Sequence, residues 1–191
     1  MMFADTTLSF NSRNPRKNLP AEVRSKQAEG RFQNDFLKVW LKKNKRVGVG
    51  GAQFELSNYG IADYIWVNSS GQIDAFEFKL NDWKGGLMQA MRYRGYARRS
   101  YLVVPNTISE RILAVADALR RTNVGVYTFD RINKEIKLLM SPRPAKPLST
   151  DAYSRAMRIL NRKRKFREIS KERKATLATS KHFVDVGDAS A

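Results

Sequence analysis

Two nearly continuous apolar runs, joined by a short loop, constrain the fold of this chain more than any other feature. The runs span residues 61–68 and 72–80, with the sequence Ser-Ser-Gly between them. A three-residue loop that contains glycine predicts a hairpin, in which Gly71 can adopt the left-handed conformation. Strands this apolar are normally buried on both faces, so each charge within them needs an explanation. These charges are Asp63, Asp74, Glu77 and Lys79.

The loop length predicts how the two strands pair. With a three-residue loop, Asn68 pairs with Gln72, and counting outward from this pair places Asp63 opposite Glu77. Directly opposed residues of an antiparallel ladder have Cβ atoms about 4.5–5.5 Å apart. Because side chains alternate between the two faces of a strand, Lys79 points to the same face as Glu77. We therefore expect two carboxylates and one ammonium group on one face of the hairpin.

Such an arrangement favours a divalent cation. Two half-buried carboxylates this close cannot both stay ionised unless a cation compensates them. Mg²⁺, or Mn²⁺ in its place, is the natural candidate, because a hard ion takes oxygen ligands from one or two carboxylates, waters and substrate phosphate. Lys79 is then placed to orient or deprotonate an attacking water, or to stabilise the charge that builds on a phosphate. The alternative is a buried structural ion cluster.

The residue composition excludes several other chemistries. The chain has no cysteine, which excludes a disulfide framework, a thiolate zinc site and a thiol nucleophile. Its one histidine, His182, lies close to the C-terminus. This argues against histidine metal clusters and Ser-His-Asp catalysis. Carboxylates, lysines and hydroxyls remain as candidate catalytic groups.

The charge balance points to a polyanionic partner. The 191 residues include 36 Lys and Arg against 18 Asp and Glu, a formal net charge of +18. Nucleic acid is the commonest polyanion for a soluble domain, although lysines can also serve solubility alone. No run approaches the roughly 18 apolar residues that span a bilayer, and the first ten residues do not resemble a signal peptide. We therefore expect an intracellular protein, cytoplasmic or nucleoid-associated, without a membrane partner.

The remaining periodicity predicts a mixed α/β fold. A helix begins at Ala21, where apolar residues recur at helical spacing, and it ends in the basic run 42–46. A first short strand, 53–56, precedes the hairpin. Helices at 87–98 and 108–121 then alternate with strands at 100–104, 124–129 and 135–140. This order implies an α/β sandwich with a mixed sheet.

Composition also divides the chain into four parts. Residues 1–20 are polar and typical of a flexible arm, 21–140 form the folded domain, and 141–149 form a Pro-rich linker. Residues 150–191 form a basic tail that is partly helical. Within it, residues 155–174 carry ten basic and two acidic residues, which favours a phosphate-binding arm over a merely solvated tail. The densest basic run is Arg162, Lys163, Arg164 and Lys165.

The charged hairpin resembles a known signature. Asp63, followed by a hairpin and by Glu77-Phe78-Lys79, resembles the motif of the PD-(D/E)XK, or restriction-endonuclease-like, nuclease superfamily. Ala62 stands where the family name places proline. Glu29 in the first helix matches an acid that many members use as a further metal ligand, although it could simply be solvated.

A second motif extends the resemblance to the helix after the hairpin. Gln89-Ala-Met-Arg-Tyr93 is similar to the Gln-x-x-x-Tyr of RecB-like members. Residues i and i+4 share a helix face, so both side chains can point toward the site. The alternative is a polar helix face at Gln89 and a core aromatic at Tyr93.

The resemblance implies a restriction-endonuclease-like α/β/α sandwich with a central mixed sheet, over about residues 25–130, with basic N- and C-terminal extensions. It also implies a role for each matching residue. Asp63 and Glu77 would hold Mg²⁺ or Mn²⁺ with the Phe78 backbone carbonyl, Lys79 would activate water, Glu29 would assist the metal, and Gln89 with Tyr93 would position the attacked strand.

Basic and aromatic residues after the hairpin are further candidates for nucleic-acid contacts. Trp83 and Lys84 could stack on or steer a strand, although Trp83 could equally cover the edge of the core. Arg92, Arg94 and Arg98 are spaced around the predicted helix, so some of them must face solvent or phosphate.

We therefore expect a metal-dependent nuclease that hydrolyses phosphodiester bonds, with DNA rather than RNA as substrate. A homodimer or a larger nucleoprotein complex would suit such an enzyme. The main alternative is a non-cleaving nucleic-acid-binding or assembly subunit built on a nuclease fold. A membrane anchor at residues 155–174 is a third hypothesis, and the segment lacks the apolar face that such helices need.

Overall fold

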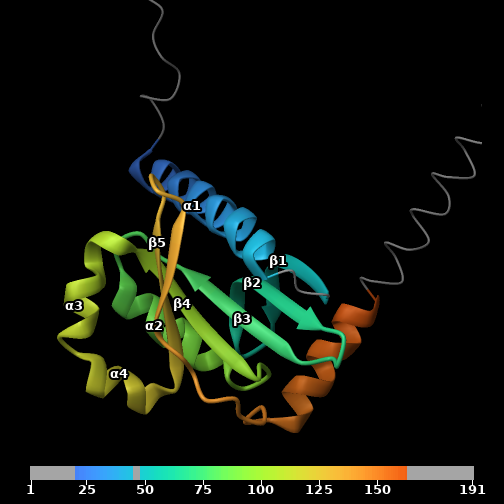
Figure 1. Cartoon of the computed structure of the whole chain (residues 1–191). Coiled ribbons are helices and arrows are strands. Elements are labelled where there is room, and N and C mark those ends of the chain that lie inside the picture. The colour runs from blue at the N-terminus through green and yellow to red at the C-terminus, as the bar shows by residue number, and fades with distance from the viewer. Residues whose placement is uncertain (1–19, 45–47, 163–191) are drawn as a thin grey trace, which may run out of the picture.

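A six-stranded mixed sheet with helices on both faces forms the body of the protein. The computed structural model describes residues 20–44 and 48–162 (Figure 1). The elements are α1 (Ala21–Asn44), β1 (Gly48–Leu56), β2 (Gly60–Asn68), β3 (Ile73–Phe78), α2 (Trp83–Tyr93), β4 (Arg99–Pro105), the short 3₁₀ helix η2 (Asn106–Ile108), α3 (Ser109–Leu113), α4 (Ala116–Thr122), β5 (Val124–Asp130) and β6 (Glu135–Met140). A further helix covers residues 150–162.

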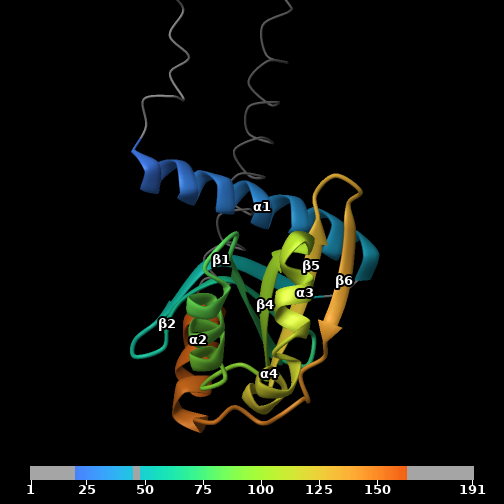
Figure 2. The ribbon, with the colours of Figure 1, turned by 90° about the vertical axis from the view of Figure 1, so that its left-hand side faces the viewer.

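The strands lie in the order β1-β2-β3-β4-β5-β6. The β1–β2, β2–β3 and β5–β6 pairs are antiparallel, whereas β3–β4 and β4–β5 are parallel. Helix α1 lies across one face of the sheet, and α2, α3 and α4 lie on the other (Figure 2). The predicted mixed α/β class is therefore confirmed.

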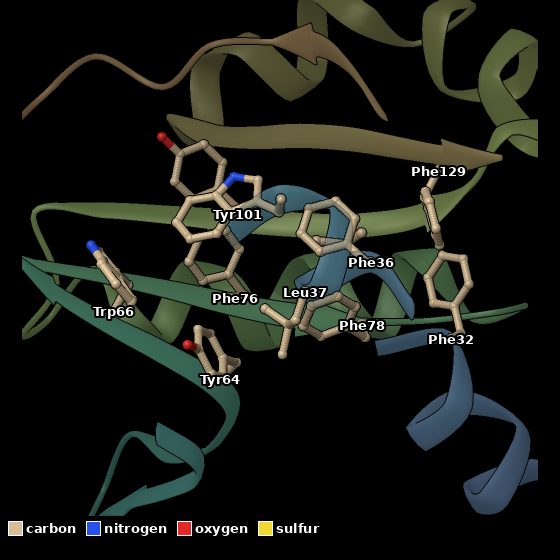
Figure 3. Close-up of a cluster of buried hydrophobic side chains, with 11 residues drawn as sticks. Phe32, Phe36, Leu37, Tyr64, Trp66, Phe76, Phe78, Tyr101 and Phe129 are labelled. Atoms are coloured by element: carbon tan, nitrogen blue, oxygen red, sulfur yellow. The ribbon is translucent and has the colours of Figure 1, made fainter. Parts of the chain in front are cut away.

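Helix α1 packs through aromatic side chains spaced at helical intervals. Phe32, Phe36 and Trp40 are fully or almost fully buried. The Phe36 ring meets Phe78 of β3 and Phe129 of β5 edge-on, with centroid distances of 5.4 and 5.7 Å (Figure 3). Each buried aromatic side chain contributes about 1.5–3 kcal/mol through the hydrophobic effect.

Strand β1 begins five residues earlier than the pattern predicted, at Gly48 instead of Gln53. Glycine has low strand propensity, so residues 48–51 did not resemble a strand. The structure shows why glycine stands here. A Cβ at Gly50 would collide with the Tyr64 ring, and one at Gly48 would lie within 2.8 Å of the Trp66 ring. The absence of side chains leaves room for two aromatic rings of β2.

Helix α2 is shifted toward the N-terminus relative to the predicted helix 87–98. It begins at Trp83 because the Asp82 side chain caps it, accepting a hydrogen bond of 2.9 Å from the Gly85 N–H. It ends at Tyr93, so Arg98 lies outside the helix.

The predicted helix 108–121 is divided into η2, α3 and α4. Ile112 and Leu119 are both buried in the core, whereas Val115 at the break is 40% exposed. Val115 does not share the buried face of Ile112 and Leu119, because the predicted single helix does not continue through it.

The packed part of the chain extends beyond Met140, where composition placed the end of the domain. Residues 141–149 pack against the turn between α2 and β4. The Leu148 and Ser149 N–H groups donate to the Arg94 and Gly95 carbonyls of this turn. The helix at 150–162 then buries Ala152 and Ala156 completely. The predicted basic tail therefore begins with a helix that packs onto the domain.

Across residues 20–44 and 48–162, none of the helices has the length and apolar character needed to cross a bilayer. Residues 1–19 of the arm predicted at 1–20, and residues 163–191 of the predicted basic tail, lie outside the described residues.

We expect Phe36→Ala to lower the free energy of unfolding by about 3–5 kcal/mol, because it removes a fully buried ring and leaves a cavity. Asn34→Ala, at an exposed position of the same helix, is the matched control and should change it by less than about 0.5 kcal/mol. Urea denaturation followed by circular dichroism measures both values. Equal effects of the two substitutions would contradict the packing of α1 described above.

Candidate metal and active site

The predicted hairpin register is confirmed. Val67 pairs with Ile73 and Ile65 pairs with Ala75, and the Asn68 N–H donates to the Gln72 carbonyl at 3.1 Å. The ladder ends at the pair Tyr64–Phe76. Asp63 and Glu77 occupy the next position along each strand, just beyond the last backbone pair.

Asp63 replaces the missing backbone partner at this position. The Phe78 N–H, which a continued ladder would direct toward β2, donates to Asp63 Oδ2 at 2.8 Å. A buried N–H group needs an acceptor, so this bond holds the carboxylate between the two strands. Burial raises the pKa of Asp63, and the Phe78 hydrogen bond and the Lys79 charge oppose that rise.

Glu77 is the most deeply buried carboxylate of the site, with only 1% of its surface exposed. Its Oε1 lies 2.9 Å from Lys79 Nζ, and its Oε2 lies 2.6 Å from the Tyr93 hydroxyl. Burial, and then the nearby Asp63 charge, raise the pKa of Glu77 from 4.5 to about 7. The carboxyl group is therefore costly to ionise without a further cation.

The Tyr93 hydroxyl faces two acceptors with a single proton. It lies 2.6 Å from both the Ile61 carbonyl and Glu77 Oε2. Both contacts are satisfied together when Tyr93 donates to Ile61 and a protonated Glu77 donates to Tyr93. Burial and the adjacent Glu77 raise the pKa of Tyr93, so the phenol keeps its proton.

Lys79 remains a cation in this environment. Burial alone would lower its pKa, but the hydrogen bond to Glu77 and the charges of Glu77, Asp63 and Glu29 outweigh burial and raise it. A protonated ammonium group can orient a water molecule and stabilise an anion, but it cannot accept a proton. Of the three predicted roles of Lys79, orienting a water molecule and stabilising charge suit a protonated ammonium group, whereas deprotonating the water does not.

Glu29 of α1 reaches the chain just after β3. Its Oε1 accepts a hydrogen bond of 3.3 Å from the Leu80 N–H, directly after Lys79 in sequence. In the parts of the chain that the structure describes, no three His, Cys, Asp or Glu side chains are close enough to form a metal cage. Glu29 therefore lies beside the Asp63–Glu77 pair without completing a three-carboxylate cluster.

The two α2 residues of the second motif differ in their contacts. Tyr93 contacts Glu77 directly, as described above. Gln89 lies one turn earlier on the same helix and is half-buried. Among the described residues it takes no part in the hydrogen bonds that hold the carboxylates.

Sequence reasoning missed two glutamines that hold Asp63. Gln33 of α1 donates to the Asp63 backbone carbonyl at 2.9 Å, and Gln53 of β1 donates to Asp63 Oδ1 at 3.3 Å. Gln53 also has a φ of 51°, in the left-handed region that non-glycine residues rarely adopt. Strained backbone of this kind often occurs at functional sites. The helical spacing of Gln33 from Glu29 was the available signal, whereas nothing in the sequence marked Gln53.

The predicted nucleic-acid contacts are scattered. Trp83 packs against the core edge and carries the Lys84 ammonium group 5.8 Å above its ring. Arg92 is exposed on α2. Arg94 instead donates to the Thr122 carbonyl at 2.9 Å, a bond that ties the end of α2 to α4.

Arg98 lies at the opposite end of β3 from the carboxylates. Its N–H donates to the Ile73 carbonyl, and Ile73 precedes Glu77 by four residues, or about 13 Å of strand. The structure therefore does not bring Arg98 to the site. Arg162 is exposed at the end of the last helix, and Lys163, Arg164 and Lys165 lie outside the described residues.

Comparison with known proteins gives little further information. No protein-family model matches this sequence, and no curated protein matches it. A solved structure that is similar is that of "SPO1766 protein of unknown function from Silicibacter pomeroyi", at 12% identity and a TM-score of 0.48. The match covers 70% of this chain and 85% of that one.

We expect the stability of the protein to fall as the pH rises from 5 to 8 in the presence of EDTA. The folded-state pKa of Glu77 is raised, so its stabilising contribution is complete below about pH 4.5 and is lost through about pH 7. A rise from 4.5 to about 7 corresponds to roughly 3 kcal/mol. In Glu77→Gln, the amide imitates the protonated carboxyl group, and this loss should be absent.

Urea titrations of both proteins at pH 5 and pH 8 provide the measurement. The free energy of unfolding of the variant is subtracted from that of the wild type at each pH, and the two differences are compared. Any cost of the substitution that does not depend on pH then cancels. A difference that does not change with pH would contradict the raised pKa of Glu77.

Proposed function

We propose that this protein is a Mg²⁺- or Mn²⁺-dependent nuclease that hydrolyses phosphodiester bonds in nucleic acid. The observation that carries this proposal is the convergence of Asp63, Glu77 and Lys79 at the end of the β2–β3 ladder. A buried carboxylate, Glu77, with a half-buried carboxylate and a half-buried ammonium group beside it, suits phosphoryl chemistry better than a purely structural role. A buried ion cluster contributes little stability compared with apolar residues of the same size.

The donor set fits a hard divalent cation. Asp63 and Glu77 supply carboxylate oxygens. Phe78, the residue after Glu77, supplies a backbone carbonyl oxygen, and Glu29 lies nearby at the Leu80 N–H. Mg²⁺ needs no more than one or two carboxylates, because waters and substrate phosphate complete its shell. When bound, the cation would polarise the phosphate and lower the pKa of a water molecule.

The side chains around this pair have distinct tasks. Protonated Lys79 orients the attacking water and stabilises the negative charge that develops on the phosphate. Tyr93 holds Glu77 in place, while the Phe78 N–H, Gln33 and Gln53 hold Asp63. Gln89, which is half-buried on the same helix face as Tyr93, is available to position the attacked strand.

Resemblance to the PD-(D/E)XK superfamily and the net charge of +18 support a nucleic-acid substrate. The preference for DNA over RNA rests on the resemblance. The confirmed hairpin register and the observed mixed sheet are compatible with a restriction-endonuclease-like fold.

We expect the full-length protein to cleave at least one member of a labelled panel of duplex, single strand, flap, four-way junction and RNA, with Mg²⁺ or Mn²⁺ but not with EDTA. Glu77→Gln should abolish cleavage, and Lys79→Ala should slow it about 10²- to 10³-fold. Glu110→Gln, at an exposed acid on α3, is the matched control and should cleave normally. Binding without cleavage on every substrate would favour the non-cleaving subunit instead.

We also expect Gln53→Gly to separate stability from metal affinity. Glycine relieves the left-handed strain and should raise the free energy of unfolding by about 1 kcal/mol. The same change removes a hydrogen bond to Asp63, so Mn²⁺ binding measured by calorimetry should weaken several-fold. Unchanged Mn²⁺ affinity would show that Gln53 does not position Asp63.

A further inference from the structure

We propose that one flank of α1, together with the β5–β6 turn, binds the sugar–phosphate backbone of a nucleic-acid duplex. This surface, called the α1 basic flank below, consists of Arg24, Arg31, Lys38 and Lys42 of α1 with Arg131 and Lys134. Its identification as a substrate surface rests on the proposed function, whereas duplex binding itself does not.

The α1 residues of this flank form a regular row. Arg24, Arg31 and Lys38 follow one another at intervals of seven residues, and Lys42 comes one turn later. Positions seven apart lie on the same side of a helix, and all four side chains are exposed. At 1.5 Å per residue, the row extends for about 27 Å. A straight row of this length can follow several successive phosphates.

The β5–β6 turn adds its charges to the same side of α1. Arg131 bonds to Asp35 of α1, with Nη2 and Oδ2 2.6 Å apart. Arg131, Lys134 and Lys38 all lower the pKa of Asp35, which places their charges near this one carboxylate. Figure 2 shows the turn rising beside α1. The row on the helix and the charges on the hairpin are therefore parts of one surface.

The acid on this flank already has a partner, because Asp35 is bound by Arg131. Six cations thus surround this one carboxylate among the described residues, and like charges gathered in this way repel one another until a polyanion neutralises them. A duplex backbone, with a negative charge about every 1.7 Å of its axis, supplies that neutralisation.

An anionic membrane fits the α1 basic flank less well. A helix that binds a membrane surface needs an apolar face to insert. The apolar face of α1 is instead buried against the sheet through Phe32, Phe36 and Trp40. Ile132, which is 91% exposed at the tip of the β5–β6 turn, is a single apolar side chain.

Helix α1 connects the flank to the candidate site. Its sheet-facing side carries Glu29, which accepts a hydrogen bond from the Leu80 N–H, and Gln33, which donates to the Asp63 carbonyl. Glu77 lies on the other face of the sheet, where Tyr93 of α2 contacts it. The same helix therefore contacts β2 and the end of β3 on one side and carries the basic row on the other.

The test compares two triple variants of the full-length protein. One changes Arg31, Lys38 and Lys134 to Gln, and the matched control changes Arg111, Arg120 and Arg121, exposed on α3 and α4, to Gln. Both remove three positive charges. Fluorescence anisotropy with a labelled DNA duplex, in EDTA and over a range of salt concentrations, gives the affinity and its salt dependence.

We expect the flank variant to lose at least about tenfold in affinity and its salt slope to fall by about 2–3, since each lost phosphate contact removes about 0.9. The control should lose much less. Equal losses in the two variants would overturn the proposal, because they would show binding by net charge alone. Loss of binding to phosphatidylserine vesicles with unchanged duplex binding would also overturn it.

The EDTA in this assay separates the proposal from the nuclease proposal, because it allows duplex binding to be measured without metal-dependent cleavage. If the wild type cleaves no substrate but the flank variant still loses duplex binding, the nucleic-acid surface is supported and only the nuclease proposal is contradicted.

Discussion

The packing of α1 across the sheet is the interaction on which the rest of the structure depends. Phe32, Phe36 and Trp40 bury their rings against three strands, and this burial fixes both the height and the rotation of the helix. Because side chains recur every three to four residues on a helix face, Glu29 and Gln33 are carried to the strand ends. The basic row lies on the opposite side of the same helix and is exposed to solvent. Hydrophobic packing of α1 thus positions both the polar side chains that contact the candidate site and the basic row on the helix surface.

The site itself depends on the place where β2 stops pairing with β3. One position beyond the last backbone pair, the Phe78 N–H is free to hold the Asp63 carboxylate. Glu77 is buried next to it and is stabilised by Lys79 and Tyr93. Burial and mutual repulsion make it costly for Asp63 and Glu77 to be ionised together. The two carboxylates therefore favour binding a proton or a cation. This preference connects the fold to the proposed chemistry.

Much of this site could be predicted because its determinants are local. A three-residue loop sets the hairpin register, and strand alternation then places Lys79 beside Glu77. The contact of Tyr93 followed from its helical spacing and the resemblance. The predictions for Arg94 and Arg98 depended instead on where α2 ends. Apolar periodicity specifies the face of a helix but not the residue at which it ends. Arg94 is used to hold α4, and Arg98 lies at the far end of the strand.

The sequence by itself determined the hairpin, its register and the charged residues on its face, because these depend on loop length and two-residue periodicity. It also determined the strong positive charge and hence the class of partner that is favoured. Only the tertiary structure decided that Gln53 and Gln33 hold Asp63, and that the α1 row meets the β5–β6 turn. These contacts join residues from separate elements. Their geometry depends on how helices and strands pack, which no local pattern specifies.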